Sequence, residues 1–369
     1  MARPRELGIA IGTGRPGPLN AITDVPGVLV GHRTLIEGSG ALRVGHGPVR
    51  TGVTVILPRS EPLFSRPVFA GCHRLNGNGE LTGLEWVRES GLLTTPVALT
   101  NTLSVGTVRD ALVAWEVRQR AGADVVWSLP VVGETWDGTL NDIAGQHIRP
   151  DHVWDALRSA APGVVAEGSV GGGTGMICHG FKGGIGTASR EVDVADMTFT
   201  LGVLVQANHG RRARLTVAGA AVGAQVSEAV VPLPGPFPPA PGRTSSIIVV
   251  VATDAPLLPM QCRRVAQRAA LGIGRTGGLG EDSSGDLILC FATGNDDLPD
   301  DSLSEPARAA VEIRMLDARH IDHFFAAVVE ATEEAILGAL LAATTMVGRD
   351  DITAHALPVA ELLQSIGSA

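Results

Sequence analysis

Tyrosine is absent from the 369-residue chain, and aromatic residues make up only 4% of it. The protein therefore has no phenol that could transfer a proton. Cysteine is also scarce, and its four residues lie far apart without a Cys-x-x-Cys pair, at Cys72, Cys178, Cys262 and Cys290. This spacing is not that of a zinc knuckle or a small disulfide scaffold. We expect reduced core thiols, with no metal and no other cofactor.

Clusters of positive charge are missing as well. The formal net charge is -9 and no run rich in lysine and arginine occurs, whereas nucleic-acid binding requires several clustered cations that face phosphates. The longest apolar helical region, residues 324–347, contains Glu330, Glu333 and Glu334, which would be costly inside a bilayer. The apolar stretch near the N-terminus is too short for a secretion signal. We predict a cytoplasmic protein that binds neither nucleic acid nor membranes.

The apolar residues that are present follow two different periods. Short runs bounded by Gly, Pro, Asn or Asp predict strands at residues 28–30, 52–57, 95–99, 199–206, 247–252 and 287–292. Several of these runs are apolar at every position, which indicates strands covered on both faces. Helical spacing predicts helices at residues 81–88, 105–119, 153–159, 259–271 and 323–346. Because strands and helices do not alternate in βαβ order, the pattern favours an α+β fold with two sheets between helices.

The glycine-rich stretches lack the context of nucleotide-binding motifs. Residues 12–17 and 272–277 match Gly-x-Gly-x-x-Gly, but the first runs into Pro-Gly-Pro and the second ends a predicted helix. Gly183 follows Lys182 where a Walker motif needs Ser or Thr. His320 and His323 stand one helical turn apart without a third ligand at a known spacing, which favours a solvated helix start over a metal site.

The border at Ser245 and Ser246 joins a segment rich in proline, residues 231–244, to a β-branched run. Two interpretations are open for the proline-rich segment: a domain linker, or a lead-in to a bond that the protein cuts. Cleavage before Ser246 would give this serine a free α-amine, a base tethered beside the hydroxyl that it activates. The residues alone equally allow two serines that simply open a strand with local hydrogen bonds.

Several longer stretches favour cleavage, because they resemble one known family. Ser-Ile-Ile-Val-Val-Val-Ala-Thr-Asp-Ala-Pro-Leu-Leu-Pro, residues 246–259, resembles the start of the C-terminal subunit in the L-aminopeptidase/D-esterase and β-peptidyl aminopeptidase family of self-cleaving hydrolases. Similar stretches recur between about residues 19 and 350, at residues 20–32, 76–83, 99–106, 180–190, 205–210 and 330–336.

The resemblance implies a four-layer αββα sandwich, formed as one domain by residues 1–369. It also implies self-cleavage into residues 1–245 and 246–369, and a homo-oligomer, a tetramer of cleaved heterodimers. The implied substrate is a short peptide, amino-acid amide or ester with a free amine.

Position by position, the resemblance also implies the site. Ser246 matches the nucleophile, and Asn208 matches the asparagine that stabilises the oxyanion. Ser284 and Asp286 match the pair that contacts the nucleophile and its amine. Glu134 matches the glutamate that receives the substrate ammonium.

Three departures from the family pattern stand at this site. Trp136 occupies a position where some relatives have tyrosine, and its indole can pack on a substrate but transfers no phenolic proton. Asp286 stands where relatives can carry glutamate, which shortens the side chain by one methylene. Ser245 precedes the cut where some relatives have Gly or Asn.

Two other functions compete with an aminopeptidase. An acyltransferase of the same architecture would share the acyl-enzyme on Ser246 and pass the acyl group to an amine. An uncleaved binding protein would keep the fold as one polypeptide. Product analysis separates the first alternative, and denaturing electrophoresis separates the second.

Overall fold

The computed structural model describes residues 3–120, 122, 126–235, 245–299 and 308–367. The rest of the proline-rich segment, residues 236–244, lies outside the described residues, so the two interpretations of that segment stay predictions. All four cysteines are buried and unpaired.

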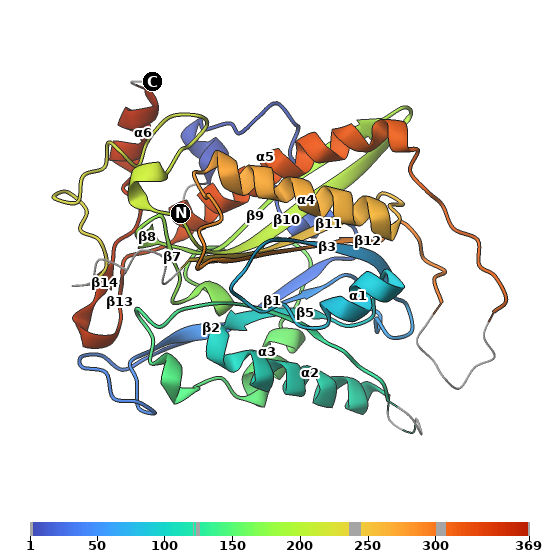
Figure 1. The fold of residues 1–369 in the computed structure, drawn as a ribbon, viewed down its shortest axis with the longest axis horizontal. Helices are drawn as coiled ribbons and strands as arrows, with labels where there is room; N and C mark the ends of the chain where they lie inside the picture. The colour runs from blue at the N-terminus through green and yellow to red at the C-terminus, as the bar shows by residue number, and fades with distance from the viewer. Residues whose placement is uncertain (1–2, 121, 123–125, 236–244, 300–307, 368–369) are drawn as a thin grey trace.

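Two sheets lie face to face in the middle of the molecule (Figure 1). The smaller sheet has the order β1-β2-β5-β6, formed by β1 (Leu29–Glu37), β2 (Val49–Leu57), β5 (Val97–Asn101) and β6 (Val131–Thr135). The larger sheet has the order β4-β3-β12-β11-β10-β9, formed by β4 (Leu92–Leu93), β3 (Val68–Gly77), β12 (Gly285–Ala292), β11 (Ser246–Thr253), β10 (Met197–Asn208) and β9 (Gly184–Val194).

Helices cover the outer face of each sheet. Helices α2 (Val105–Gln119) and α3 (Pro150–Arg158) pack on the smaller sheet, and α4 (Pro259–Arg275) and α5 (Ile321–Ala342) pack on the larger one (Figure 1). The predicted four-layer αββα sandwich is therefore confirmed. Further elements include α1 (Leu84–Ser90), α6 (Val359–Gly367), several short 3-10 helices and two short strand pairs, β7 (Ile177–Cys178) with β8 (Phe181–Lys182) and β13 (Met346–Val347) with β14 (Thr353–Ala354).

Strand β11 is apolar at nearly every position because both of its faces are buried. Ile248, Val250 and Ala252 point into the core between the two sheets. The alternate side chains, Ile247, Val249 and Val251, point into the core under α4 and α5. Because successive side chains of a strand alternate between its faces, a strand between two cores is apolar throughout. This packing holds the start of β11 rigidly in the centre of the larger sheet.

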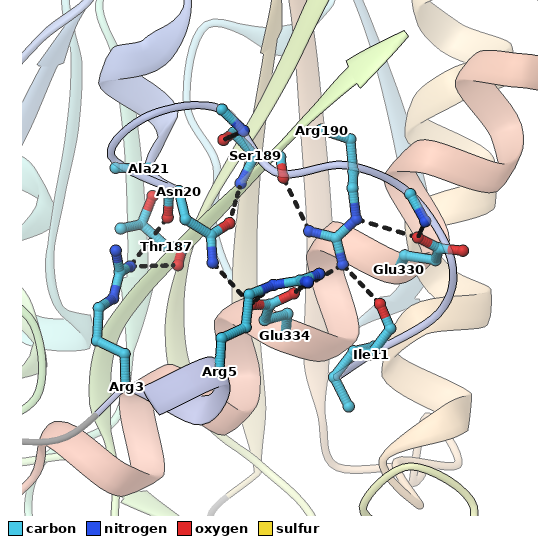
Figure 2. A network of polar contacts seen from close by, with 12 residues as sticks. Arg3, Arg5, Ile11, Asn20, Ala21, Thr187, Ser189, Arg190, Glu330 and Glu334 are labelled. Atoms are coloured by element: carbon cyan, nitrogen blue, oxygen red, sulfur yellow. Dashed lines mark hydrogen bonds and ion pairs between the residues drawn. The ribbon is translucent and has the colours of Figure 1, made fainter. Parts of the chain in front are cut away.

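A buried ionic network attaches the N-terminal segment to β9 and α5 (Figure 2). The Arg190 guanidinium, which is fully buried, donates to Glu330 at 3.0 Å and to Glu334 at 2.7 Å. Arg5 forms a two-bond fork with the same Glu334 carboxylate, at 2.9 and 3.1 Å. Asn20 donates to Glu334 at 2.6 Å. The buried charges of Arg190 and Glu334 therefore each have several partners, as buried charges require.

Within the described ranges, no helix combines the length and the apolar character needed to cross a membrane. Helix α5 is the longest, and its charged residues explain this result: Glu333 and Glu334 are buried within the protein beside arginines rather than facing lipid.

Candidate active site

Three strands of the larger sheet converge at Ser246. This serine is the first residue of β11, and in the antiparallel pairing with β10 it stands opposite Asn208. On its other side, in the parallel pairing with β12, it stands opposite Gly285. Only 5% of Ser246 is exposed. Two of the predicted site residues, far apart in sequence, are thus fixed side by side by strand register.

The Ser246 hydroxyl lies beside the peptide bond that precedes it. Its Oγ donates to the Ser245 carbonyl oxygen at 2.6 Å. The Gly285 N–H points at both oxygens, at 3.3 Å from Ser246 Oγ and 3.3 Å from the Ser245 carbonyl oxygen. A backbone donor at this point can polarise the carbonyl or hold the hydroxyl oxygen.

Ser284 and Asp286 continue this group along β12 and the residue before it. Ser284 Oγ donates to Asp286 Oδ1 at 2.6 Å and lies 3.2 Å from Ser245 Oγ. Burial raises the pKa of Asp286 to about 6, an effect that the Ser284 hydrogen bond partly opposes. Ser284 and Asp286 therefore lie together beside Ser245, and the Asp286 carboxyl group has a pKa near the range of ordinary working pH.

The Asn208 amide is held from both ends. Its Oδ1 accepts a hydrogen bond from the Ile177 N–H at 2.8 Å, and its Nδ2 donates to the Trp136 carbonyl oxygen at 3.0 Å. These bonds fix which end of the amide faces which neighbour. They also link Asn208 to Trp136, whose partly buried ring packs against Gly138. The strand pair β7–β8 and the end of β6 therefore orient the amide that was predicted from the sequence.

Glu134 lies at the end of β6 and is 2% exposed. Its carboxylate accepts a hydrogen bond from the Glu80 N–H at 3.0 Å and another from the Thr102 hydroxyl. Burial raises the pKa of Glu134, while both hydrogen bonds act in the opposite direction.

Gly79 leaves room between Glu134 and the junction. A Cβ at Gly79 would stand 2.9 Å from Glu134 Oε1 and 3.0 Å from the Gly285 Cα. Gly285 is the strand neighbour of Ser246. The space that a Gly79 side chain would fill therefore lies between the Glu134 carboxylate and this neighbour of Ser246.

Sequence reasoning did not assign roles to several residues that shape this site. Thr102 and Gly79 lie in stretches that carry the family resemblance, but only the folded chain brings them to Glu134. Ile177 and Gly285 act through backbone N–H groups, which any residue except proline provides, so no side chain could have revealed them.

A separate group of possible metal ligands lies next to Asn208, at the end of β10 and the turn after β7. Ligand atoms of Cys178, His179 and His209 all lie within 4.8 Å of one another, and all three residues are buried. His320 and His323 have ring centroids 6.1 Å apart near the start of α5.

Known proteins with this fold define the class. A β-aminopeptidase from a Burkholderia species has 54% sequence identity and a TM-score of 0.90, with 100% of this chain and 99% of that one covered. The L-aminopeptidase D-Ala-esterase/amidase of Ochrobactrum anthropi, described as a variant of the Ntn hydrolase fold, has 42% identity and a TM-score of 0.91 over the same shares. The fold and these matches thus define an aminopeptidase with the Ntn hydrolase fold.

The particular family follows from the sequence match. Residues 20–354 match the model of peptidase family S58, and the chain belongs to that family. The β-peptidyl aminopeptidase BapA of Sphingosinicella microcystinivorans is 46% identical over 371 residues, which cover 98% of this chain and 90% of the relative. BapA of Sphingosinicella xenopeptidilytica is 44% identical over 363 residues. The resemblance stated from the sequence is therefore confirmed.

Proposed function

We propose that the chain cuts itself between Ser245 and Ser246 and then hydrolyses short peptides, amino-acid amides or esters that have a free amine. The new N-terminal Ser246 is the nucleophile and carries the acyl group. The observation that carries this proposal is the position of Ser246 Oγ, 2.6 Å from the carbonyl oxygen of the bond to be cut and opposite Asn208 in the sheet.

Self-cleavage begins with attack of Ser246 Oγ on the carbonyl carbon of Ser245. The C–N bond breaks, an ester forms between Ser245 and the Ser246 hydroxyl oxygen, and the proton of that hydroxyl moves to the released α-amine. Water then hydrolyses the ester, which leaves a carboxylate on Ser245 and a free hydroxyl and amine on Ser246. The Gly285 N–H, 3.3 Å from the Ser245 carbonyl oxygen, supports this route as a donor to the charge that develops there.

The cleaved enzyme uses the same groups on a substrate. The α-amine of Ser246 accepts the hydroxyl proton as Oγ attacks the substrate carbonyl, and that proton passes to the leaving amine. The Asn208 amide stabilises the oxyanion of the tetrahedral intermediate. Water resolves the acyl-enzyme. Asp286, hydrogen-bonded to Ser284, faces the α-ammonium whenever the amine carries the extra proton.

Glu134 selects the substrate. Its buried carboxylate offers a charge-assisted hydrogen bond to a free ammonium group in a space that Gly79 keeps open. Trp136, whose carbonyl oxygen holds the Asn208 amide, packs its indole against the substrate side chain. The relatives named for β-peptides support a choice of substrate that includes β-amino acids.

The ionic network around Arg190 suits a chain that is cut but stays together. Arg5, Asn20 and Arg190 belong to residues 1–245, whereas Glu330 and Glu334 belong to residues 246–369. These buried contacts therefore join the two proposed fragments. We further propose one domain over residues 1–369, a cytoplasmic location and assembly into a homo-oligomer of cleaved heterodimers, which cell fractionation and sedimentation analysis test.

Acyl transfer is the second candidate function, because it would proceed through the same acyl-enzyme. The experiment is to incubate the enzyme with an alanyl p-nitroanilide, with and without an excess of an acceptor amine, and to analyse the products by mass spectrometry. Hydrolysis predicts free alanine as the main product in both mixtures. A predominant alanyl–acceptor product would replace the proposal with an acyltransferase, and no release of p-nitroaniline from either mixture would favour an uncleaved binding protein.

A further inference from the structure

Cys178, His179 and His209 meet where the turn after β7 contacts the end of β10. The His179 N–H donates to the His209 carbonyl oxygen at 2.7 Å, which fixes the two backbones against each other. Cys178 Sγ lies 3.7 Å from His209 Nδ1. The two imidazole rings stand edge to face with centroids 5.1 Å apart. One thiol and two imidazoles are the donor types that bind zinc.

Two ring nitrogens in this cluster lack hydrogen-bond partners among the described residues and could instead bind a metal. Nε2 of His179 and Nε2 of His209 are both buried and have no hydrogen-bond partner within the described part of the chain. Buried polar atoms of this kind are normally paired. Nδ1 of His179 lies 3.2 Å from the Arg211 carbonyl oxygen, so it carries the proton and donates it. This leaves the Nε2 lone pair for a ligand, as in metal-bound histidines oriented by a backbone carbonyl.

The backbone is shaped to bring the His179 ring into this position. His179 has φ of 49°, in the left-handed region that a side chain other than glycine rarely adopts. At Gly210, an added Cβ would lie 2.2 to 2.6 Å from atoms of that ring. A residue with unfavourable backbone geometry and a glycine that admits its ring thus occur together at the cluster.

We propose that Cys178, His179 and His209 bind one Zn²⁺ ion, through the Cys178 thiolate, Nε2 of His179 and a ring nitrogen of His209. Ligand atoms around a tetrahedral zinc stand roughly 3.3 to 3.7 Å apart. The 3.7 Å between Cys178 Sγ and His209 Nδ1 already matches this separation, and the remaining ligand atoms, all within 4.8 Å of one another, need to approach by up to about 1.5 Å. Three protein ligands leave the fourth position to water.

Zinc binds the thiolate form of cysteine, so binding through Cys178 replaces the thiol proton. Each ion bound therefore releases one proton to the solvent.

The proposed ion would act on the candidate active site through the backbone that carries Asn208. His209 follows Asn208 directly, and Cys178 follows Ile177, whose N–H holds Asn208 Oδ1. A zinc ion would therefore fix both segments that orient this amide, without contact with the substrate. The inference does not depend on the proposed function, because an uncleaved or inactive chain would bind zinc equally well.

The test compares the full-length protein with Cys178→Ser and with the matched control Cys72→Ser, which replaces a buried thiol on β3 outside the cluster. Each is produced in medium supplemented with zinc, dialysed against metal-free buffer and analysed for metal by mass spectrometry. We expect about one zinc per chain in the wild type and in Cys72→Ser, and at most about one tenth in Cys178→Ser.

Cobalt provides a readout that does not require any variant to fold. Wild-type protein produced with Co²⁺ in place of zinc should show the thiolate-to-cobalt charge-transfer absorption of a cysteine ligand, and chelation should lower its melting temperature. Wild-type protein with neither stoichiometric zinc nor a thiolate–cobalt band would overturn the inference. So would equal zinc content in a folded Cys178→Ser variant.

Discussion

Asn208 and Ser246 face each other across the β10–β11 pair, the last residue of one strand opposite the first residue of the next. Strand register alone therefore places an amide donor beside the hydroxyl. Because the Asn208 amide is also held by Ile177 and Trp136, it can act without first reorganising, which is the condition for strong stabilisation of an oxyanion.

Replacement of Asn208 by alanine should therefore lower kcat by about 10² to 10³-fold with a smaller change in KM. Activity is measured on an alanyl p-nitroanilide and divided by the cleaved fraction of the protein. Asn295→Ala is the control, because Asn295 is also buried and also donates to a backbone carbonyl, that of Arg314. A kcat for Asn208→Ala equal to that of Asn295→Ala would remove Asn208 from the oxyanion site.

Glu134 should give the enzyme its preference for a free amine. An unblocked alanyl p-nitroanilide should have a kcat/KM at least about tenfold above that of its N-acetyl derivative, because acetylation removes a charge-assisted bond and leaves a buried carboxylate unpaired. Glu134→Gln should reduce this ratio mainly by raising KM for the free amine. Equal values for both substrates in the wild type would show that Glu134 has another role.

Asp286 should make stability depend on pH in the uncut protein. Burial raises its pKa from 3.8 to about 6 in the folded chain, so the folded state binds the proton more tightly than the unfolded state. Its contribution is fully present below the unfolded pKa and is lost as the pH rises through about 6.

In the Ser246→Ala background, the stability of Asp286→Asn relative to the protein with Asp286 should therefore rise by about 2 kcal/mol as the pH increases from about 4 to about 7. Urea-induced unfolding at several pH values measures the difference. A difference that stays constant with pH would mean that Asp286 titrates normally.

Glu334 should be essential for holding the N-terminal segment to α5. It pairs with the fully buried Arg190 and with Arg5, so Glu334→Gln should lower the free energy of unfolding by about 2 to 4 kcal/mol. Glu85 is the matched control, since its carboxylate is 91% exposed beside Arg88, and Glu85→Gln should cost less than about 1 kcal/mol. Urea-induced unfolding in the Ser246→Ala background gives both values, and equal losses would contradict the account.

The sequence predicted those elements whose buried faces follow from the local spacing of apolar residues. The bounds of α2, Val105–Gln119, agree with the prediction, and the unbroken apolar run of β11 correctly indicated a strand between two cores. Helix α5 ends at Ala342, earlier than residue 346, because Ala343 takes an extended conformation.

Strand β9 escaped prediction for a physical reason. Its sequence, Gly-Ile-Gly-Thr-Ala-Ser-Arg-Glu-Val-Asp-Val, is rich in small and polar residues and has no continuous apolar run. An added Cβ at Gly186 would lie 1.9 Å from the Ala335 carbonyl oxygen, so α5 packs directly on the backbone there. Arg190 is buried only because Glu330 and Glu334, about 140 residues away, neutralise it. Local patterns contain no record of such partners.

The residues of the candidate site could be predicted from the sequence, but the contacts that orient them could not. Ser246, Asn208, Glu134, Ser284 and Asp286 could be named because their surrounding stretches resemble a family. The contacts that orient them, such as Thr102 with Glu134 and Ile177 with Asn208, join distant segments or use backbone groups. The Cys178–His179–His209 cluster likewise becomes visible only when the end of β10 meets the turn after β7.

The intact mass of the purified protein under denaturing conditions tests the central claim most directly. The account predicts two polypeptides, residues 1–245 and residues 246–369 beginning Ser-Ile-Ile-Val, in the wild type. It predicts one uncut, folded and inactive chain for Ser246→Ala, because that variant lacks only the attacking hydroxyl. A wild-type enzyme that hydrolyses its substrate as a single uncut chain, or a fragment that begins at Ser245, would contradict the assignment of Ser246 as the nucleophile.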